Sequence, residues 1–332
     1  RMTVLDLRCR FGTRYFPSPI FTASGCAASG RELAQFVSLS ELGAVVTKSI
    51  ALKARSGRAT PRMAETPSGM LNSIGLQGPG VDQFIAQDVP WLLEHGARVV
   101  VSISGETVEE YASLARRVKS VPGISGLEVN ISCPNVENRG LVFACDPSTT
   151  KEVVSAIRRN VGGEFPVIVK LSPDVTDIVA IARECVNAGA DGLALINTVL
   201  GMVIDLKSKR PKLAGKTGGL SGPAIRPIAV RAIYQVHAAF PSMPILGMGG
   251  VMSGRDALEM IYAGASGVSI GTANFSDPGS TVRIKNELSS LLIEAGYTSV
   301  ADAVGVAILN FVPNVYKNLH DFNANGNCKI RF

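Results

Sequence analysis

The chain has 332 residues, 46% of them hydrophobic and 18% charged, with 34 glycines and a formal net charge of +6. Such a composition, without any polar low-complexity tract, fits one large α/β domain with a buried core and excludes an extensively disordered chain. No apolar run approaches the ~18–20 residues of a membrane span, and the first residues lack the apolar stretch of a signal peptide, so we expect a cytoplasmic protein.

Short apolar runs alternate with helix-length amphipathic segments along nearly the whole chain. In chain order the predicted strands are 21–24, 44–50, 99–104, 126–132, 167–171, 192–197, 245–249 and 267–271. The predicted helices lie near 29–42, 80–95, 106–120, 148–161, 175–188, 223–239 and 253–263, with one more after 278. Asp174 and Ser253 are predicted to cap helix starts, and Gly189 and Gly264 to follow helix ends. Eight strands, each followed by a helix, predict a (β/α)8 TIM barrel.

The alternative architecture is an open, doubly wound sheet. Its first strand-to-helix turn should carry the spacing GxGxxG, which is absent there, and Gly247-Met248-Gly249-Gly250 does not have that spacing. The sequence therefore favours the barrel.

Neither the charges nor the cysteines form a recognisable binding motif. Lysines and arginines gather at 53–62 and 207–212 without interleaved aromatic residues, which is typical of solvated loops rather than of a nucleic-acid surface. A mild positive bias suits small anionic ligands. The six cysteines lack CxxC or Cys/His spacing, which indicates reduced thiols and no metal site.

Polar residues lie where the predicted strands end. In a barrel the carboxyl ends of the strands carry the chemistry, and here they include two lysines and two asparagines. Lysine and asparagine are poor strand residues, so their convergence on one face favours a polar ligand cradle over a set of solvated strand ends. The four residues are Lys48, Asn130, Lys170 and Asn197.

Cys133 follows the strand at 126–132 and precedes Pro134, which stops regular pairing. A thiol on a loop over a barrel mouth is a candidate catalytic group. The alternative is that Cys133 is a small buried hydrophobic residue.

Two glycine-containing turns end the last two strands. Gly249-Gly250 and Gly271-Thr272 stand where barrels often bind phosphate, because glycine lets backbone N–H groups approach an anion closely. The alternative is that both are simply tight turns.

Several motifs resemble the dihydroorotate dehydrogenases from about residue 3 to about residue 307. They are TASGC (22–26), TKSI (47–50), NSIGLQGPG (72–80), EVNISCPNV (128–136), VIVKLSPDVTDI (167–178), LINT (195–198), GGLSGPAIRPIAVR (218–231), GMGGV (247–251) and SIGTA (269–273). The sequences of these motifs are most similar to those of class 1B, the NAD-dependent two-subunit enzymes. The fumarate-linked homodimers of class 1A remain the alternative, whereas the class 2 membrane enzymes have serine at the position of Cys133.

The resemblance implies bound FMN and oxidation of (S)-dihydroorotate to orotate in pyrimidine biosynthesis, with Cys133 as the base for C5 and a hydride passing from C6 to FMN. The implied substrate contacts are Lys48, Asn72, Ser73, Ile74, Gly75, Leu76, Asn130, Asn197 and Thr198. The implied FMN contacts are Ala23, Ser24, Thr47, Lys48, Ser102, Asn130, Lys170, Ile196 and Gly222, with Gly249, Gly250, Gly271 and Thr272 at the phosphate. Ser102 replaces a common asparagine, which implies a weaker or water-mediated contact. Segment 134–146 corresponds to a lid.

Class 1B also implies a partner subunit that carries FAD and a [2Fe–2S] cluster, and a homodimer of barrels within a heterotetramer. This chain itself has neither a GxGxxG nucleotide fingerprint nor a cysteine cluster. We expect one domain over 1–307 and a tail of unknown role over 308–332. Two other functions stay open: a phosphate-binding barrel lyase or isomerase, and a catalytically silent scaffold barrel.

Overall fold

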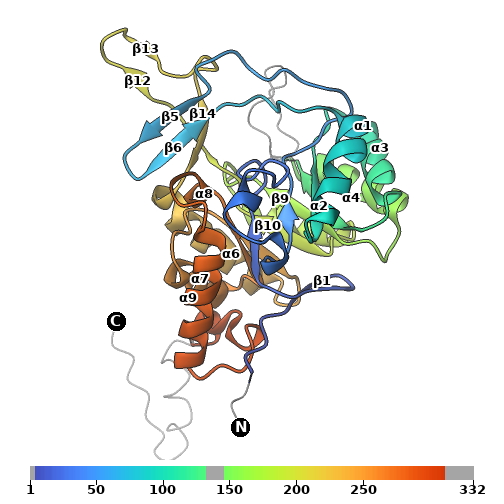
Figure 1. Cartoon of the computed structure of the whole chain (residues 1–332), viewed down its shortest axis with the longest axis vertical. Helices are drawn as coiled ribbons and strands as arrows, with labels where there is room; N and C mark the ends of the chain where they lie inside the picture. Colours follow the sequence, from blue (N-terminus) through green and yellow to red (C-terminus); the bar gives the residue numbers. More distant parts are fainter. Residues whose placement is uncertain (1–3, 132–145, 311–332) are drawn as a thin grey trace, which may run out of the picture.

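The computed structural model describes residues 4–131 and 146–310, and eight parallel strands form its centre (Figure 1). In chain order they are β3 (Ile20–Thr22), β4 (Val45–Val46), β7 (Val99–Ile103), β8 (Ile124–Asn130), β9 (Val167–Leu171), β10 (Gly192–Leu195), β15 (Ile245–Gly247) and β16 (Gly267–Ile270). Their spatial order follows the chain from β4 round to β16, which pairs with β3. The predicted TIM barrel is confirmed.

The barrel closes between β3 and β4 through a side chain. The Thr22 hydroxyl donates to the Val46 carbonyl at 3.1 Å and accepts from the Val46 N–H at 2.9 Å. The Gly43 N–H donates to the Ile20 carbonyl at 2.7 Å on the same seam. Because β4 has only two residues, Thr22 supplies the bonds that a longer ladder would make, and the loops that follow β3 and β4 come together at the barrel mouth.

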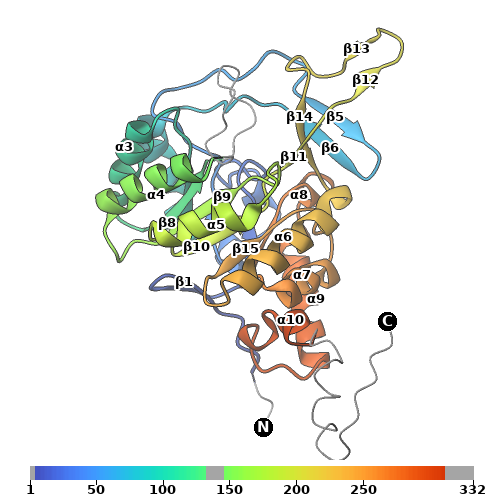
Figure 2. The same cartoon turned by 180° about the vertical axis from the view of Figure 1, so that it is seen from behind.

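Helices cover the outside of the strands (Figure 2). The larger ones are α3 (Val108–Lys119), α4 (Pro147–Val161), α5 (Ile178–Asn187), α6 (Arg226–Ala239), α7 (Gly254–Ala263) and α9 (Ser280–Glu294). Shorter ones are α1 (Val81–Gln83), α2 (Val89–Glu94), α8 (Ala273–Ser276) and α10 (Val306–Asn310). Ser253 caps α7 as predicted, accepting from the Asp256 N–H at 3.3 Å. None of the helices described here is both long and apolar enough to cross a membrane.

Two local predictions were wrong. The segment 29–42 holds two short 3-10 turns, Leu33–Gln35 and Leu39–Glu41, because Ser38 between them has extended backbone that interrupts a helix. The cap of α5 is Asp177, whose carboxylate accepts from the N–H groups of the first turn. Asp174 instead accepts the Leu200 N–H at 3.1 Å, which ties the β9–α5 loop to the strand that follows β10.

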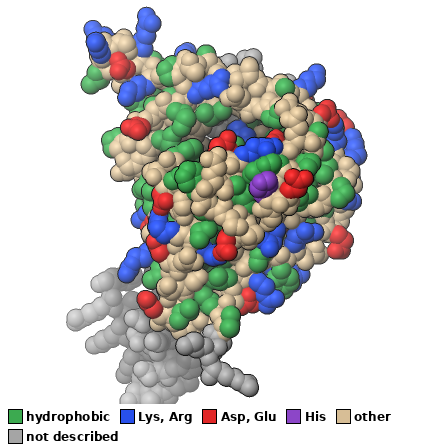
Figure 3. All heavy atoms as spheres, in the orientation of Figure 1, with side chains coloured by type: hydrophobic (Ala, Val, Ile, Leu, Met, Phe, Trp, Pro, Cys, Tyr) green, Lys and Arg blue, Asp and Glu red, His purple; other side chains and the backbone are tan. Residues whose placement is uncertain are grey.

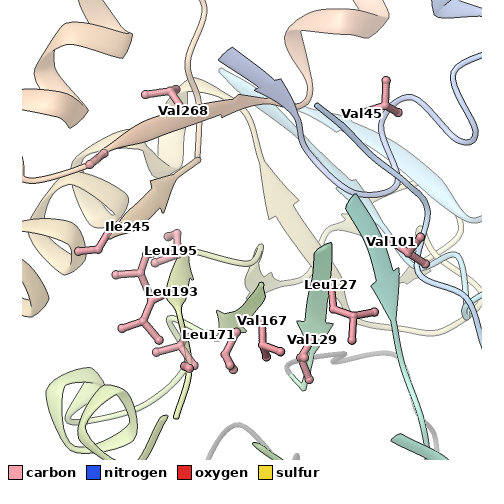
Figure 4. Close-up of a cluster of buried hydrophobic side chains, with 14 of the residues drawn as sticks. Val45, Val101, Leu127, Val129, Val167, Leu171, Leu193, Leu195, Ile245 and Val268 are labelled. Carbon is pink, nitrogen blue, oxygen red and sulfur yellow. The ribbon is translucent and has the colours of Figure 1, made fainter. Parts of the chain in front are cut away.

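Alternation along the strands produces two hydrophobic cores. Side chains such as Val101, Val129 and Leu193 point away from the barrel axis and pack against the helices (Figure 4). Alternate residues point inward. The amino-terminal ends of the strands form the lower end of the barrel interior, opposite the mouth. There Phe11 and Phe16, from the hairpin of β1 (Cys9–Phe11) and β2 (Arg14–Phe16), pack against Phe21, with ring centroids 5.3 to 6.1 Å apart.

An antiparallel sheet that the sequence did not predict stands beside the barrel mouth (Figure 1). Its strands are β11 (Val199–Gly201), β14 (Gly218–Ser221), β6 (Gly69–Asn72) and β5 (Met63–Thr66). A hairpin of β12 (Ile204–Asp205) and β13 (Arg210–Pro211) extends from it. The basic residues of 207–212 are exposed at its tip, in agreement with a solvated loop (Figure 3). The predicted tail 308–332 lies outside the described residues except for 308–310.

Candidate active site

A cavity of about 310 Å³ opens at the carboxyl ends of the strands. Most of the sequence-predicted site residues line it, although they come from segments far apart in the chain. They are Ala23, Ser24, Lys48, Asn72, Ile74, Leu76, Asn130, Lys170, Ile196, Asn197, Thr198, Gly222, Gly249, Gly250, Gly271 and Thr272. The barrel mouth and the β6–β14 sheet together therefore enclose one site.

Four predicted residues do not line the cavity. Thr47 and Ser102 are fully buried beneath it, and the Ser102 N–H donates to the Thr47 hydroxyl at 3.3 Å. The Ser73 hydroxyl accepts from Arg58 Nη1 at 2.9 Å, and Gly75 has a positive φ of 78° in the same loop. Their ligand contacts stay predictions. Cys133 and the predicted lid, apart from its last residue, lie outside the described residues.

Sequence reasoning missed part of the lining. The residues concerned are Cys26, Met63, Met70, Ser221, Ile225, Met248 and Phe275, whereas Gly25 and Ser49 also line the cavity and were expected there as residues at predicted strand ends. Cys26 and Ser221 belong to the motifs already quoted and could have been found by position. Met63 and Phe275 come from β5 and α8, and no local pattern places these elements at the mouth.

A continuous set of hydrogen bonds runs along the floor of the site. Ser102 and Glu128 face each other on β7 and β8, and the Ser102 hydroxyl donates to Glu128 Oε1 at 3.0 Å. The hydroxyls of Ser49 and Ser102 are 2.9 Å apart, and Asn130 Nδ2 donates to the Ser49 hydroxyl at 3.0 Å. Asn197 Nδ2 lies 3.4 Å from Asn130 Oδ1. Two amides that face the cavity are thus connected to a carboxylate below it.

Lys170 brings a positive charge into the same floor. It is 5% exposed, its Nζ donates to the Ser24 hydroxyl at 3.0 Å, and Glu128 Oε1 is 3.9 Å away. The Cys26 thiol also lines the cavity. Burial raises the pKa of Cys26, and the positive charges of Lys170 and Lys48 oppose that rise. The site therefore presents two lysines and a neutral thiol to a ligand.

The turns that follow β15 and β16 form a glycine cradle that lines part of the cavity. Gly250 has a φ of 74°, and a Cβ there would lie 2.5 Å from the Gly222 carbonyl oxygen. A Cβ on Gly249 would lie 2.9 Å from the Ala229 methyl group. In the described part of the chain, no backbone or side-chain acceptor pairs with the N–H of Gly250 or Thr272. Glycines that admit no side chain, with N–H groups left for a ligand, fit the phosphate of FMN.

Within 4–131 and 146–310, histidine, cysteine, aspartate and glutamate side chains form no group of three or more that could hold a metal ion. The donors at the mouth are ammonium, amide, hydroxyl and backbone N–H groups, which suit an anionic organic ligand.

Comparisons with known proteins agree with the geometry. Residues 7–292 match the family model for dihydroorotate dehydrogenase. A relative from Anoxybacillus flavithermus is 51% identical over 87% of this chain and 91% of its own length, and one from Pelobacter propionicus is 51% identical over 87% and 94%. A Geobacter relative is 48% identical over 87% and 93%. All three are named dihydroorotate dehydrogenase B (NAD(+)), catalytic subunit. The chain belongs to the dihydroorotate dehydrogenase family.

Proposed function

We propose that this chain is the catalytic subunit of an NAD-linked dihydroorotate dehydrogenase, which oxidises (S)-dihydroorotate to orotate in pyrimidine biosynthesis. The observation that carries the proposal is that the amides and lysines of the barrel mouth and the glycine cradle of the last two strands line one shared cavity. The family match and the relatives of about half-identical sequence support the same reaction.

FMN, when bound, accepts the hydride that the substrate loses from C6. Its phosphate would be held by the backbone of Gly249, Gly250, Gly271 and Thr272. Lys170, already fixed by the Ser24 hydroxyl, would place a positive charge beside the ring where negative charge increases on reduction.

Amide side chains would orient the substrate. Asn72, Asn130 and Asn197 all line the cavity, and each offers a donor and an acceptor on one planar group, which suits the amide edges of a dihydropyrimidine. The Thr198 N–H donates to Asn197 Oδ1 at 2.9 Å and so fixes the orientation of that amide. Lys48, from the loop after β4, would balance the charge of the substrate carboxylate.

Arg58 would support the substrate loop from outside the cavity. Its Nη1 donates to the Ser73 hydroxyl, and its N–H donates to the Ile74 carbonyl at 3.0 Å. The Ser73 N–H donates to the Arg62 carbonyl at 2.7 Å. These bonds hold the segment that brings Asn72 and Ile74 to the site, so Ser73 and Gly75 would act through the shape of the loop.

Cys133 is the proposed base that removes the proton from C5, adjacent to the substrate carbonyl. It follows directly on Ser132 in the motif that contains Asn130. A positioned thiolate is a stronger base for this step than a serine hydroxyl, and nearby positive charge favours ionisation of a thiol. Lys48 and Lys170, which both line the cavity, are described residues that would supply such charge at the mouth.

Electrons must then leave the flavin. The relatives are named NAD-linked catalytic subunits, which means that they work with another subunit, and we propose the same for this chain. Because the sequence has no GxGxxG fingerprint and no cysteine cluster, the partner would carry FAD and a [2Fe–2S] cluster. We further propose a homodimer of barrels within a heterotetramer.

The test compares electron acceptors for the purified, FMN-loaded chain, with and without its partner subunit. We expect dihydroorotate oxidation with a redox dye, hardly any with NAD+ alone, and NAD+ reduction once the partner is added. Rapid turnover with fumarate would assign the chain to the class 1A type instead. A colourless chain that does not oxidise dihydroorotate would contradict the proposal and favour a phosphate-binding lyase, an isomerase or a scaffold.

A further inference from the structure

Glu128 is a carboxylate inside the barrel that substrate and cofactor binding do not explain. It is 1% exposed on β8, below the floor of the cavity, and does not line it. Oε1 accepts from the Ser102 hydroxyl and lies 3.9 Å from Lys170 Nζ. Within the described residues, Oε2 has no hydrogen-bond partner. A buried carboxylate with one unpaired oxygen is costly, and an apolar residue would serve packing better.

The carboxylate fixes the direction of the side-chain hydrogen bonds that lead from Ser102 through Ser49 to Asn130. A carboxylate only accepts, so the Ser102 hydroxyl must donate to Glu128 and is then left to accept from Ser49. The Ser49 hydroxyl, having donated its proton, accepts from Asn130 Nδ2. Asn130 Oδ1 is therefore the atom directed toward Asn197. The charge of Glu128 thus determines the orientation of the Asn130 amide through two intervening hydroxyl groups.

The same carboxylate opposes the field of Lys170. The two charged groups are 6% and 1% exposed, so solvent screens them little. Lys170 lines the cavity, whereas Glu128 does not. A ligand beside Lys170 therefore experiences an ammonium whose charge is partly balanced from below.

We propose that Glu128 is a positioning residue with two separable effects. Through Ser102 and Ser49 it sets the amide orientation of Asn130 toward the pyrimidine, and through Lys170 it lowers the reduction potential of the bound flavin. The inference rests on the proposed function, because it concerns the FMN and orotate that the cavity would hold.

Two variants separate the two effects. Glu128→Gln removes the charge but keeps an oxygen that can accept from Ser102, so the potential of the bound FMN shifts to a more positive value and orotate affinity changes little. Ser102→Ala interrupts the hydrogen bonds but keeps the charge, so the potential stays near that of the wild type. We expect the orotate dissociation constant of Ser102→Ala to rise about fivefold, as for the loss of one ordinary hydrogen bond. Dye-coupled reductive titration measures the potential, and orotate-induced changes in the flavin spectrum measure the affinity.

Glu128→Asp keeps the experiment usable if the glutamine variant does not fold. Its carboxylate is drawn back by one methylene from Lys170, so we expect a smaller shift of the potential in the same direction. An unchanged potential in Glu128→Gln, or in Glu128→Asp if only that variant folds, would overturn the effect on the flavin. Orotate affinity within twofold of the wild type in Ser102→Ala would overturn the effect on Asn130.

The wild-type chain, measured in parallel, separates this inference from the proposed function. If it binds FMN and is reduced by dihydroorotate while both variants match it in potential and affinity, only the inference on Glu128 fails. If it binds no FMN, the proposed function fails and the inference fails with it.

Discussion

The two ends of the barrel interior are both filled by inward-pointing side chains, but one end is aromatic and the other is charged and polar. At the lower end Phe11, Phe16 and Phe21 are fully buried, and the Phe11 ring packs edge to face against the other two rings. At the mouth the inward positions hold Glu128 and Lys170, which are also almost fully buried. Burial alone thus does not distinguish core from site.

The two ends are stabilised by different kinds of interaction, apolar packing at the lower end and paired polar groups at the mouth. Burial of aromatic rings is favourable because it removes apolar surface from water, and this gain tolerates small displacements of the rings. Buried charges and amides are stable only with specific partners, and a lost partner leaves a desolvated group. We therefore expect changes at the lower end to affect mainly the free energy of unfolding, and changes at the mouth to affect mainly ligand binding and turnover.

The largest effect is expected from Cys133→Ala. Removal of a general base typically costs on the order of 10²–10⁴ in rate, while the amides and glycines that hold the ligands remain. Stopped-flow reduction of FMN by dihydroorotate should be slowed by such a factor, with orotate affinity preserved. Flavin reduction at the wild-type rate at pH 7 would remove Cys133 from the mechanism.

Gly250→Val tests the phosphate end of the mouth. The valine Cβ would collide with the Gly222 carbonyl, so the turn would have to move away from the conformation in which its backbone would meet the phosphate. We expect largely colourless protein. Gly163→Val is the control, because a Cβ at Gly163 meets nothing within 4 Å and Gly163 does not line the cavity. A full complement of FMN in Gly250→Val would exclude the phosphate assignment.

Phe16→Ala tests the lower end. Truncation of a fully buried phenylalanine costs about 3–5 kcal/mol, so the midpoint of urea unfolding should fall clearly. Because Phe16 packs at the end opposite the mouth, the FMN dissociation constant of the folded fraction should stay within about twofold. A large loss of FMN affinity would show that the two ends are not independent.

The smallest effect is expected at His237, outside both ends. Burial lowers the pKa of His237, and within the described residues its Nδ1 has no hydrogen-bond partner. The unfolded chain then binds a proton more tightly than the folded chain. The free energy of unfolding is therefore not reduced by this group above the ordinary histidine pKa of about 6.5, and it decreases as the pH falls below that value. His237→Gln should weaken the acid dependence of the unfolding midpoint between about pH 7 and pH 5, and an unchanged profile would exclude this group.

The barrel and much of the mouth could be predicted because both depend on local patterns. Strand runs such as 167–171 end in residues that strands otherwise avoid, so Lys170 was identified by its position. The antiparallel sheet was missed because its strands have only three or four residues each and include several glycines.

The remaining site features could not be predicted because they depend on how segments far apart in the chain pair in space. Met63 and Phe275 reach the cavity only through the placement of β5 and α8. Ser102 is fully buried and its hydroxyl donates to Glu128, while its expected contact with the cofactor stays a prediction. The pairing of β7 with β8 sets the bond to Glu128, and nothing in either segment alone reveals it.

The most direct test mixes the purified yellow chain with a stoichiometric amount of (S)-dihydroorotate in the absence of oxygen and any other acceptor. The account predicts that the visible flavin band is bleached and that about one orotate forms for each FMN reduced. Addition of NAD+ should leave the flavin reduced until the partner subunit is present. A flavin band that dihydroorotate does not bleach would contradict the account.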